Sequence, residues 1–479
     1  MKKSLLLAMG ISLLLVSCGN SDVAFLPDSM KFYLKDVVKT QDKITLNAVG
    51  TQNILVLPIQ FSDYTCDGLA GGCAGSKQNI ETAFFGEAED TGWESVASFY
   101  QKSSYGKLNI TGTVADWYQV GTTFAEAERR HEILGDDPTW YILRDAVQAY
   151  KDAHDEIYQF DKNMDGYIDA VWMIYSAPYS TNSSTTFEWA FTFWDYLQNP
   201  DPLSPVGNAY AWASYQFIFE GNYSKPDAHS YIHETGHLLG LEDYYSYDTW
   251  DWSPVGQLDM MDGNIGDHDA FSKGVLGWTE PFVAQKAGEI TLRPFESTGD
   301  CLIIGNQWNG TMFSEYLLLE YYTPTGLNQL DAELGYPNRP RMFTQSGLKV
   351  LHIDARLGAF KWMTSVNSWV FTGYTDQVVY ASNPILNDFQ CTRVLASNTP
   401  SISINPNYRL IHLLESSGRN TLATGLMASN QMLFKAGDSF GLNAVFKGFT
   451  FHDAMGLPFG FTVKSMNDRG ITIQLEKIK

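Results

Sequence analysis

The sequence predicts a mixed α/β (α+β) domain over residues 49–282, followed by an antiparallel all-β domain over residues 283–479. Up to about residue 280, apolar β-prone runs alternate with amphipathic stretches of helical period. Later residues form short alternating runs separated by Gly, Asn, Pro and Ser, a pattern typical of antiparallel sheets. With 479 residues, of which 44% are hydrophobic, the chain can bury more than one core.

The N-terminus predicts a secretion signal that ends at a lipid attachment site. Two lysines precede an apolar run at residues 5–16, which is too short to span a bilayer. The residues up to Cys18 resemble a bacterial lipobox, which implies removal of a signal peptide at residues 1–17 and diacylation of Cys18. Residues 18–48 would then form a tether on the non-cytoplasmic side of a bacterial membrane. An ordinary cleaved signal with an incidental cysteine is the alternative.

Net charge restricts the partners of the chain. The formal charge of −22 becomes −24 once the two lysines of the signal leave. A strongly acidic chain repels nucleic acid and anionic headgroups, so no nucleic-acid partner is expected and the lipid would be the membrane contact. No run after the signal approaches eighteen uninterrupted apolar residues. The protein is therefore expected outside the cytoplasm, anchored by lipid or released from the membrane.

Four further cysteines would lie in an oxidising compartment, and their number is even. Cys66 and Cys73 flank a glycine-rich loop and are predicted to form one disulfide. Cys301 and Cys391 lie far apart in the C-terminal part and are predicted to form another. Buried thiols without a disulfide are the alternative, because cysteine is sparse in this chain.

The sequence of the first domain predicts alternating strands and helices. We expect strands where apolar runs are rich in β-branched and aromatic residues, and helices where apolar residues recur three and four positions apart. These are a buried strand at 53–61, helices around 80–85 and 93–102, a strand at 108–117, a helix at 139–154 and a strand at 168–175. Two aromatic strands follow at 187–194 and 209–219, and one of them is a candidate to pair with an extended peptide substrate.

An acidic loop precedes the strand at 168–175. Asp161, Asn163, Asp165 and Asp169 place oxygen side chains around a glycine turn, a pattern that can bind Ca²⁺. The loop departs from an EF-hand, because a strand follows it and its twelfth position is Trp172 instead of a glutamate. A turn built from Asp and Asn side chains, without an ion, is the alternative.

Residues 233–243 predict a zinc site. His233 and His237 are at i and i+4, so they project from one helix face and can bind the same tetrahedral zinc ion. Glu234 sits beside the open coordination position, where a carboxylate can accept a proton from water. Gly240 allows the left-handed backbone that ends a helix, so that Asp243 can fold back as third ligand. An amphipathic helix with two solvated or core histidines is the alternative.

The surroundings of this motif are also predicted. Its helix is expected over residues 225–239, after a capping box that begins at Ser224. Met260 and Met261 lie where a methionine turn could form beneath the metal, although a pair of methionines is more often core. A helix at 269–276 closes the first domain. The clearest strands of the C-terminal domain are at 289–293, 315–322, 348–353, 409–414 and 470–475.

With these residues laid out, the chain resembles the immune inhibitor A-type family of bacterial secreted metallopeptidases, a branch of the metzincins. The marks are Phe61-Ser62-Asp63, Ser104-Tyr105-Gly106-Lys107, the acidic loop, the motif H-E-x-x-H-x-x-G-x-x-D, Asp259-Met260-Met261 and Leu276-Gly277-Trp278. The resemblance implies a metzincin-like zinc peptidase domain, with His233, His237 and Asp243 as zinc ligands. It also implies Glu234 as general base and Met261 as the Met-turn residue, with Met260 as the alternative.

The sequence therefore predicts a membrane-tethered extracellular zinc metalloendopeptidase of proteins or peptides, with Zn²⁺ as cofactor and Ca²⁺ as a further candidate ion. Tyr244 and Tyr245 are candidates to stabilise tetrahedral charge, or are packing residues. His268 contacts substrate or lies in a polar loop. A non-catalytic adhesion or binding lipoprotein that retains a peptidase-like domain is the alternative function, and glycosylated proteins are a narrower substrate class.

Overall fold

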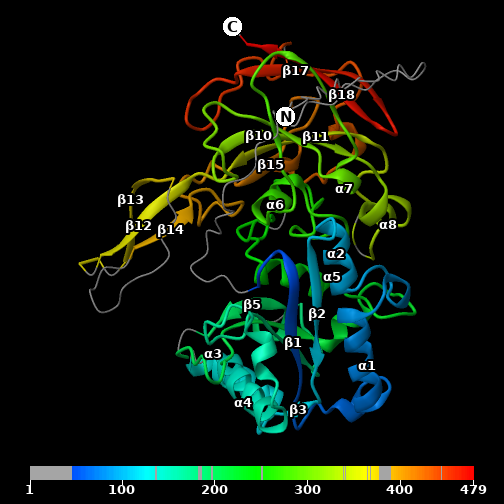
Figure 1. The fold of residues 1–479 in the computed structure, drawn as a ribbon, viewed down its shortest axis with the longest axis vertical. Coiled ribbons are helices and arrows are strands. Elements are labelled where there is room, and N and C mark those ends of the chain that lie inside the picture. The colour runs from blue at the N-terminus through cyan, green and yellow to red at the C-terminus, as the bar shows by residue number, and fades with distance from the viewer. Residues whose placement is uncertain are drawn as a thin grey trace, which may run out of the picture.

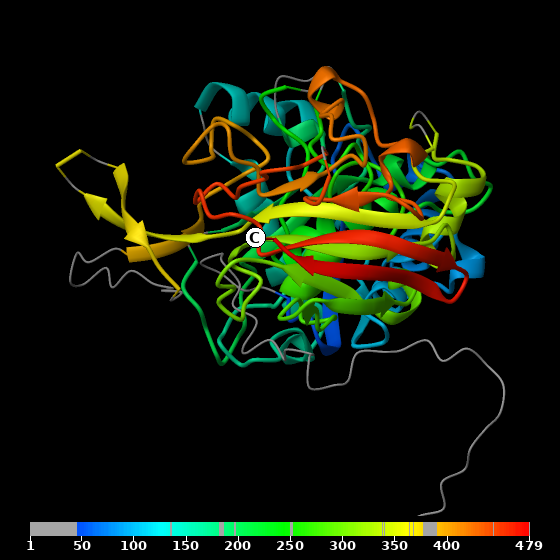
Figure 2. The same cartoon turned by 90° about the horizontal axis from the view of Figure 1, so that it is seen from above.

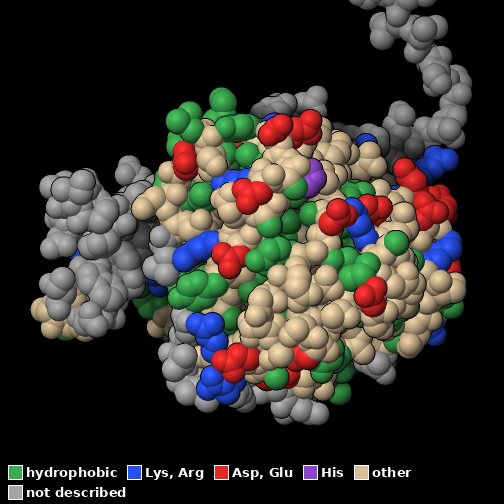
Figure 3. Space-filling model, turned by 90° about the horizontal axis from the view of Figure 1, so that it is seen from below, with side chains coloured by type: hydrophobic (Ala, Val, Ile, Leu, Met, Phe, Trp, Pro, Cys, Tyr) green, Lys and Arg blue, Asp and Glu red, His purple; other side chains and the backbone are tan. Residues whose placement is uncertain are grey.

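The computed structural model describes residues 46–478, apart from residues 135–136, 182–185, 196–197, 250–251, 338, 340, 364, 367, 377–389 and 444. The predicted signal peptide, the lipid attachment site at Cys18 and nearly all of the predicted tether lie outside these residues, so they stay predictions. Within the described part, no helix combines the length and the apolar character that a membrane span requires. The face drawn in Figure 3 carries its basic side chains in small groups beside acidic ones.

A six-stranded sheet forms the centre of the N-terminal part (Figure 1). Its order is β2-β1-β4-β6-β5, and β3 pairs with the end of β1. All neighbours are parallel except β5, which is antiparallel to β6 and forms one edge of the sheet. The strands are β1 (Gly50–Gln60), β2 (Leu108–Val114), β3 (Tyr118–Gln119), β4 (Val171–Tyr175), β5 (Phe191–Trp194) and β6 (Ala209–Ser214).

Helices cover both faces of this sheet, which explains why its inner strands are apolar on both sides. Along β1, Ile54 and Val56 face one apolar cluster, whereas Leu55 and Leu57 face another. The first cluster includes α1 (Gly72–Phe85), α2 (Val96–Ser103) and α5 (His229–Leu238). The second includes α3 (Phe124–Leu134) and α4 (Pro138–Ala153).

Two sheets pack face to face in the C-terminal part, with one apolar cluster between them (Figures 1 and 2). Their strand orders are β15-β11-β10-β9-β7 and β16-β17-β18-β8. The first sheet contains β7 (Phe282–Val283), β9 (Cys301–Ile304), β10 (Glu315–Tyr322), β11 (Gly347–Asp354) and β15 (Ile411–Leu413). The second contains β8 (Gly288–Leu292), β16 (Ser439–Phe440), β17 (Phe459–Asn467) and β18 (Gly470–Lys477).

The prediction of an antiparallel all-β C-terminal part is wrong in two respects. First, β7 pairs in parallel with β9. This is possible because the chain between them passes through β8 of the other sheet and the short helix α7 (Phe295–Thr298). Second, α7 and α8 (Gln329–Glu333) are helices. The four-stranded sheet is antiparallel throughout, and the coarser class of mixed α/β with several sheets is confirmed.

A three-stranded antiparallel sheet projects from the molecule as an arm, on the left of Figures 1 and 2. Its strands are β12 (Leu357–Met363), β13 (Ser368–Tyr374) and β14 (Gln390–Val394). Cys391 lies on β14, but its side chain is outside the described residues. Cys301, on β9, is buried with its sulfur 3.8 Å from Thr279 Oγ1. The disulfide between Cys301 and Cys391 therefore stays a prediction.

One apolar cluster joins the N-terminal and C-terminal parts. It includes Tyr231 on α5, Phe271 on α6 (Ala270–Val275) and Leu318 on β10. Figure 1 shows α6 between the helical layer that holds α5 and the sheet that holds β10. The predicted domain boundary after residue 282 falls inside β7. The two predicted domains therefore share part of their core, and α6 packs against β10 of the C-terminal sheet.

The helix of the zinc motif starts later than predicted. α5 begins at His229, not at residue 225. The residue before it, Ala228, forms no side-chain capping hydrogen bond, so the predicted capping box at Ser224 is not formed. Instead, Asp227 Oδ1 accepts the N–H of His229 at 3.1 Å, and Asp227 Oδ2 accepts the hydroxyl of Tyr336. A contact from a distant part of the chain therefore holds the residues before the helix in another conformation.

Candidate metal centre

Two histidines and one aspartate converge at the C-terminal end of α5. Oδ1 of Asp243 lies 3.0 Å from Nε2 of His233 and 3.4 Å from Nε2 of His237. These three atoms all lie within 4.8 Å of one another. Two imidazole nitrogens and one carboxylate oxygen form a donor set that suits zinc and leaves a fourth position for water. The structure thus brings together the three predicted ligands.

The backbone after the helix makes this convergence possible. α5 ends at Leu238, and Gly240 has a φ of +92°, a conformation in which a residue with a Cβ is strained. The N–H of Gly240 donates to the carbonyl of His237 at 2.9 Å, and the N–H of Leu241 donates to the carbonyl of Gly236 at 3.0 Å. These bonds close the helix end, and the chain then doubles back toward the imidazoles.

Backbone carbonyls orient both imidazoles. Nδ1 of His233 lies 2.7 Å from the carbonyl oxygen of Met260, and Nδ1 of His237 lies 2.8 Å from that of Leu241. Because a carbonyl only accepts, each Nδ1 must carry the proton and donate. The Nε2 atoms are then the nitrogens with a lone pair to offer a cation, which is the usual arrangement of histidines that bind a metal.

The charges of these three residues depend strongly on one another. Burial lowers the pKa of His237, but the charge and hydrogen bond of Asp243 outweigh burial and raise it to about 10. Burial favours the neutral form of Asp243, yet the two imidazoles hold its pKa well below the usual range. A proton on His237 and a metal ion compete for the same nitrogen, so metal affinity is expected to rise with pH.

Glu234 is buried beside the two histidines, with 6% of its surface exposed. Its Oε2 accepts the hydroxyl hydrogen of Thr192 on β5 at 3.0 Å, and the same hydroxyl lies 3.1 Å from the Glu234 carbonyl. Burial raises the pKa of Glu234, and the nearby imidazoles and Thr192 offset part of this rise. The sequence contained no local signal for Thr192, because it lies 42 residues away on another element.

Three tyrosines follow the third ligand, and they have different roles. Tyr244 is buried and its hydroxyl pairs with Ser272 Oγ at 2.6 Å, so it is a packing residue. Tyr245 lies over the imidazole of His233, with ring centroids 6.5 Å apart. Tyr247, which the sequence reading did not single out, donates its hydroxyl to Asp243 Oδ2. Of the two tyrosines proposed from the sequence, only Tyr245 faces the metal ligands.

Met261 lies directly beneath the helix of the motif. It is fully buried, and a Cβ added to Gly236 would lie 2.4 Å from its sulfur. Gly236 stands between the two histidines of α5, so the thioether forms an apolar floor under them. Met260 contributes its backbone carbonyl to His233 instead. The geometry therefore favours Met261 over Met260 as the residue of the methionine turn.

His268 does not face solvent or the metal ligands. It is 1% exposed, and its ring lies against Phe99, Tyr100 and Trp278. Its Nδ1 is 3.8 Å from Oδ1 of Asp259. His268 therefore lies in the loop before α6, which is one of the two expected alternatives, but this loop is buried because the segment after Met261 folds into the core shared with the C-terminal sheet. Its position does not support contact with substrate.

The acidic loop at 161–169 uses its own oxygens to hold its backbone. The two carboxylate oxygens of Asp161 accept the N–H groups of Asp165 and Gly166 at 3.1 and 2.9 Å. The N–H of Lys162 donates to Asp169 Oδ2 at 3.0 Å. Burial and then the neighbouring carboxylates raise the pKa of Asp169 to about 6. These bonds match the turn alternative, and calcium binding stays a prediction.

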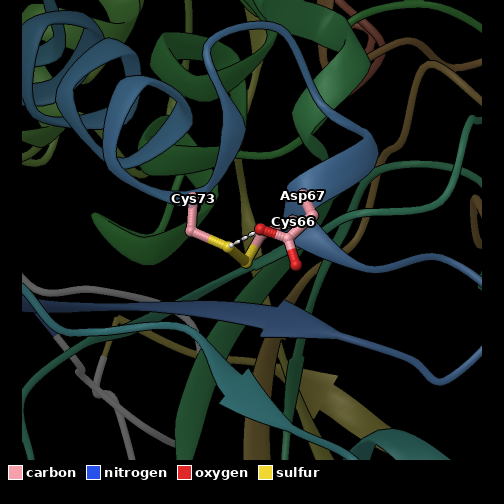
Figure 4. Close-up of side chains that lie close together, drawn as sticks. All are labelled: Cys66, Asp67 and Cys73. Carbon is pink, nitrogen blue, oxygen red and sulfur yellow. Dashed lines mark hydrogen bonds between the residues drawn. A yellow bond between two sulfur atoms is a disulfide. The ribbon is translucent and has the colours of Figure 1, made fainter.

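Cys66 and Cys73 form the predicted disulfide, with Cα atoms 4.6 Å apart (Figure 4). Oδ1 of Asp67 lies 3.4 Å from the sulfur of Cys73. These three residues are close enough to resemble a metal site, but sulfurs joined in a disulfide offer no thiolate to a metal. The disulfide therefore removes this group from consideration as a metal centre.

Comparisons with known proteins do not assign this chain to a family. No family model and no curated protein matches the sequence. Among solved structures, one similar chain is a catalytically inactive OgpA from Akkermansia muciniphila, in complex with the O-glycopeptide substrate glycodrosocin. It shares 10% sequence identity, the match covers 75% of this chain and 88% of that chain, and the TM-score is 0.19. A similarity this low does not support an argument about fold or function.

Proposed function

We propose that this protein is a zinc-dependent metalloendopeptidase that acts on proteins or peptides. The observation that carries the proposal is the Asp243 oxygen held between Nε2 of His233 and Nε2 of His237. The Nδ1 atoms of both rings already donate to carbonyls, so the Nε2 atoms are the ones suited to a cation. The donor set therefore fits zinc.

Zinc bound there would supply a Lewis acid that polarises a scissile carbonyl and makes a water molecule more acidic. Glu234 would take the proton from the attacking water and deliver it to the leaving amine. Its raised pKa, caused by burial, suits a carboxylate that must hold this proton between the two steps. The hydroxyl of Thr192 would hold the carboxylate in place, and Tyr247 would do the same for Asp243.

The edge strand β5 would bind the peptide. The six-stranded sheet ends at β5, which pairs with β6 on one side only. Thr192, in the middle of β5, contacts the proposed base. An extended substrate can add to a strand edge through main-chain hydrogen bonds, and pockets along the strand then select its side chains. Of the two strands expected to border the cleft, β5 is the better candidate because β6 is interior.

Two further parts of the proposal rest on the sequence. The lipobox-like residues support a lipid anchor on Cys18 and a location outside the cytoplasm. The ordered motifs support membership of the immune inhibitor A-type peptidases. Neither part bears on the chemistry at Glu234. The proposed reaction would therefore hold even if the protein carried no lipid anchor.

The proposed base is tested with Glu234→Gln in the full chain. We expect hydrolysis of casein to fall by roughly 10²–10⁴-fold, because proton transfer to and from the reacting groups is lost. Zinc content, measured by mass spectrometry of the elements, should equal that of the unaltered chain, because Glu234 is not a ligand. Glu220→Gln is the matched control, since Glu220 also accepts a hydroxyl bond, from Ser230 at 3.0 Å, but is not a predicted catalytic group.

Two results would contradict the proposal. Unchanged casein hydrolysis by Glu234→Gln would exclude Glu234 as the base. A zinc-loaded, folded wild-type chain that cleaves neither casein, gelatin nor mucin, with or without prior removal of glycans, would favour the binding lipoprotein instead.

A further inference from the structure

A second group of metal-ligand side chains lies in the C-terminal part, away from the motif. Glu315 begins β10, His352 lies on the neighbouring strand β11, and His452 lies in the segment before β17. Their ligand atoms all lie within 4.8 Å of one another, as do those of His233, His237 and Asp243. We call this group the Glu315 cluster.

The Glu315 cluster repeats the local geometry of the first site. Oε1 of Glu315 lies 3.0 Å from Nε2 of His352 and 3.6 Å from Nδ1 of His452. In the first site, the corresponding distances from Asp243 Oδ1 are 3.0 and 3.4 Å. In both places, one carboxylate oxygen is held between two imidazole nitrogens. Of the two rings, only that of His352 is hydrogen-bonded to Glu315, because Nδ1 of His452 bonds to Asp354 Oδ2 at 2.8 Å. A divalent ion that displaces the imidazole protons would find one oxygen and two nitrogens as ligands.

The cluster is enclosed, but one ligand reaches solvent. The Glu315 and His352 side chains are 2% and 8% exposed, whereas that of His452 is 21% exposed. The ring of His452 stacks on Tyr408, with centroids 3.9 Å apart and planes at 5°. The N–H groups of His452 and Asp453 donate to Glu315 at 2.5 and 3.3 Å. The ligands are thus held in place, and His452 is the one most exposed to solvent.

The neighbouring charges determine the expected affinity. Nδ1 of His452 also lies 2.8 Å from Asp354 Oδ2, and Asp354 forms a two-pronged ion pair with Arg356 at 2.7 Å for each bond. Arg356 Nε lies 3.5 Å from the other oxygen of Glu315. This guanidinium offsets one of the two carboxylate charges. We therefore expect weaker metal binding here than at Asp243, where Glu234 adds a negative charge and, within the described part of the chain, no arginine is seen to pair with the ligand.

We propose that Glu315, His352 and His452 form a second binding site for a divalent transition-metal ion such as Zn²⁺. The ion would join the β10–β11 pair to the segment that carries His452, which lies about a hundred residues further along the chain. It would have a structural role, because it would tie together parts of the sandwich. The inference does not depend on the proposed peptidase activity.

The test uses the full chain with His233→Ala and His237→Ala, which removes the first site. Titration with Zn²⁺ should still show about one bound ion per chain, and Co²⁺ should give the visible absorption of a cobalt–imidazole complex. Adding His352→Gln and His452→Gln should abolish both signals. Adding His412→Gln instead should leave them unchanged, because His412 pairs with His352 across the strands but is outside the cluster.

Folding of each variant is measured separately, so that a loss of Zn²⁺ binding can be assigned to the loss of a ligand and not to unfolding. His452→Gln alone changes the most exposed ligand and should weaken Zn²⁺ binding at least tenfold while circular dichroism stays unchanged. Zn²⁺ should also raise the melting temperature of the background variant, and this rise should disappear with His452→Gln. Failure of the background variant to bind Zn²⁺ or Co²⁺ would overturn the proposal. So would Zn²⁺ binding that survives His352→Gln with His452→Gln, or that disappears with His412→Gln.

Discussion

The two histidine–carboxylate groups of this protein have the same local geometry but opposite origins. At Asp243, three ligands come from one stretch of eleven residues, because a helix places two histidines on one face and a glycine turn returns the chain. At Glu315, strand pairing brings His352 alongside, and a fold-back of 137 residues brings the backbone of His452. The comparison shows that local sequence can reveal a site only where one short segment supplies its ligands.

The two groups also differ in what holds their imidazoles. Backbone carbonyls of Met260 and Leu241 fix the rings of the first site. In the Glu315 cluster, the ring of His452 is held by Tyr408 and by the pair of Asp354 with Arg356. Neutral carbonyls leave the first site free to hold a doubly charged ion, whereas Arg356 opposes a cation at the second.

The largest expected difference is in activity. Asp243→Ala should lower kcat/KM on a protein substrate by several decades, roughly 10³-fold or more, because it removes a ligand of the proposed catalytic ion. Glu315→Gln should leave kcat/KM within about threefold, because Glu315 is neither a ligand of the proposed catalytic ion nor a proposed catalytic group. Hydrolysis of a fluorescent casein substrate measures both. Equal losses in the two folded variants would show that the Glu315 cluster is coupled to catalysis.

The next effect concerns the tyrosine that supports the first site. Tyr247→Phe removes the hydroxyl that donates to Asp243, and it should weaken Zn²⁺ binding about 10–100-fold. Competition with a chromophoric chelator gives the affinity. Tyr408→Phe is the matched change beside His452. It keeps the stacked ring and removes a hydroxyl that donates to the backbone carbonyl of His452 at 3.2 Å and not to a ligand atom, so it should weaken Zn²⁺ binding at the Glu315 cluster far less. An unaltered affinity in Tyr247→Phe would mean that the hydroxyl does not position Asp243.

A smaller effect tests the floor beneath the first site. Gly236→Ala places a Cβ against the sulfur of Met261, which is 2.4 Å away, so the helix or the methionine must move. We expect a loss of about 1–3 kcal/mol in the free energy of unfolding, measured by urea titration. Met261→Ala in the same chain should recover part of it. Binding of Zn²⁺ at the Glu315 cluster should be unaffected, and a loss there would contradict the independence of the two groups.

The smallest expected effect is a change of stability with pH at the acidic loop. Unlike the two histidine–carboxylate groups, this loop uses its side-chain oxygens to accept hydrogen bonds from its own backbone N–H groups. Burial raises the pKa of Asp169 to about 6, above its ordinary value of 3.8. Its contribution to stability is therefore fully present below about pH 4 and is lost as the pH rises through about 6. Relative to Asp169→Asn, the unaltered chain in EDTA should lose on the order of 1 kcal/mol of stability between those pH values.

Calcium provides the control for this loop. If the loop binds Ca²⁺, the ion should cancel the pH-dependent loss in the unaltered chain and have no effect on Asp169→Asn. Thermal unfolding with and without millimolar Ca²⁺ measures this difference. Identical curves would exclude the calcium prediction and leave the turn interpretation. A stability difference that does not depend on pH would contradict the raised pKa of Asp169.

Local sequence was sufficient wherever one segment contains the whole physical cause. The spacing of His233 and His237 predicts a shared helix face, and Gly240 predicts the turn that returns Asp243, because both follow from backbone geometry alone. The apolar run of β1 predicted a buried strand for the same reason. The short loop between Cys66 and Cys73 likewise predicted their disulfide.

Tertiary structure decided whatever depends on contacts between distant segments. Asp227 accepts a bond from Tyr336 and shortens the predicted helix, Thr192 reaches Glu234 from an edge strand, and β7 pairs in parallel with β9. The fold also buries His268 in a core that crosses the predicted domain boundary and assembles the Glu315 cluster from three separate elements. No window of sequence contains these effects, because side chains far apart along the chain meet only when the sheets and helices pack.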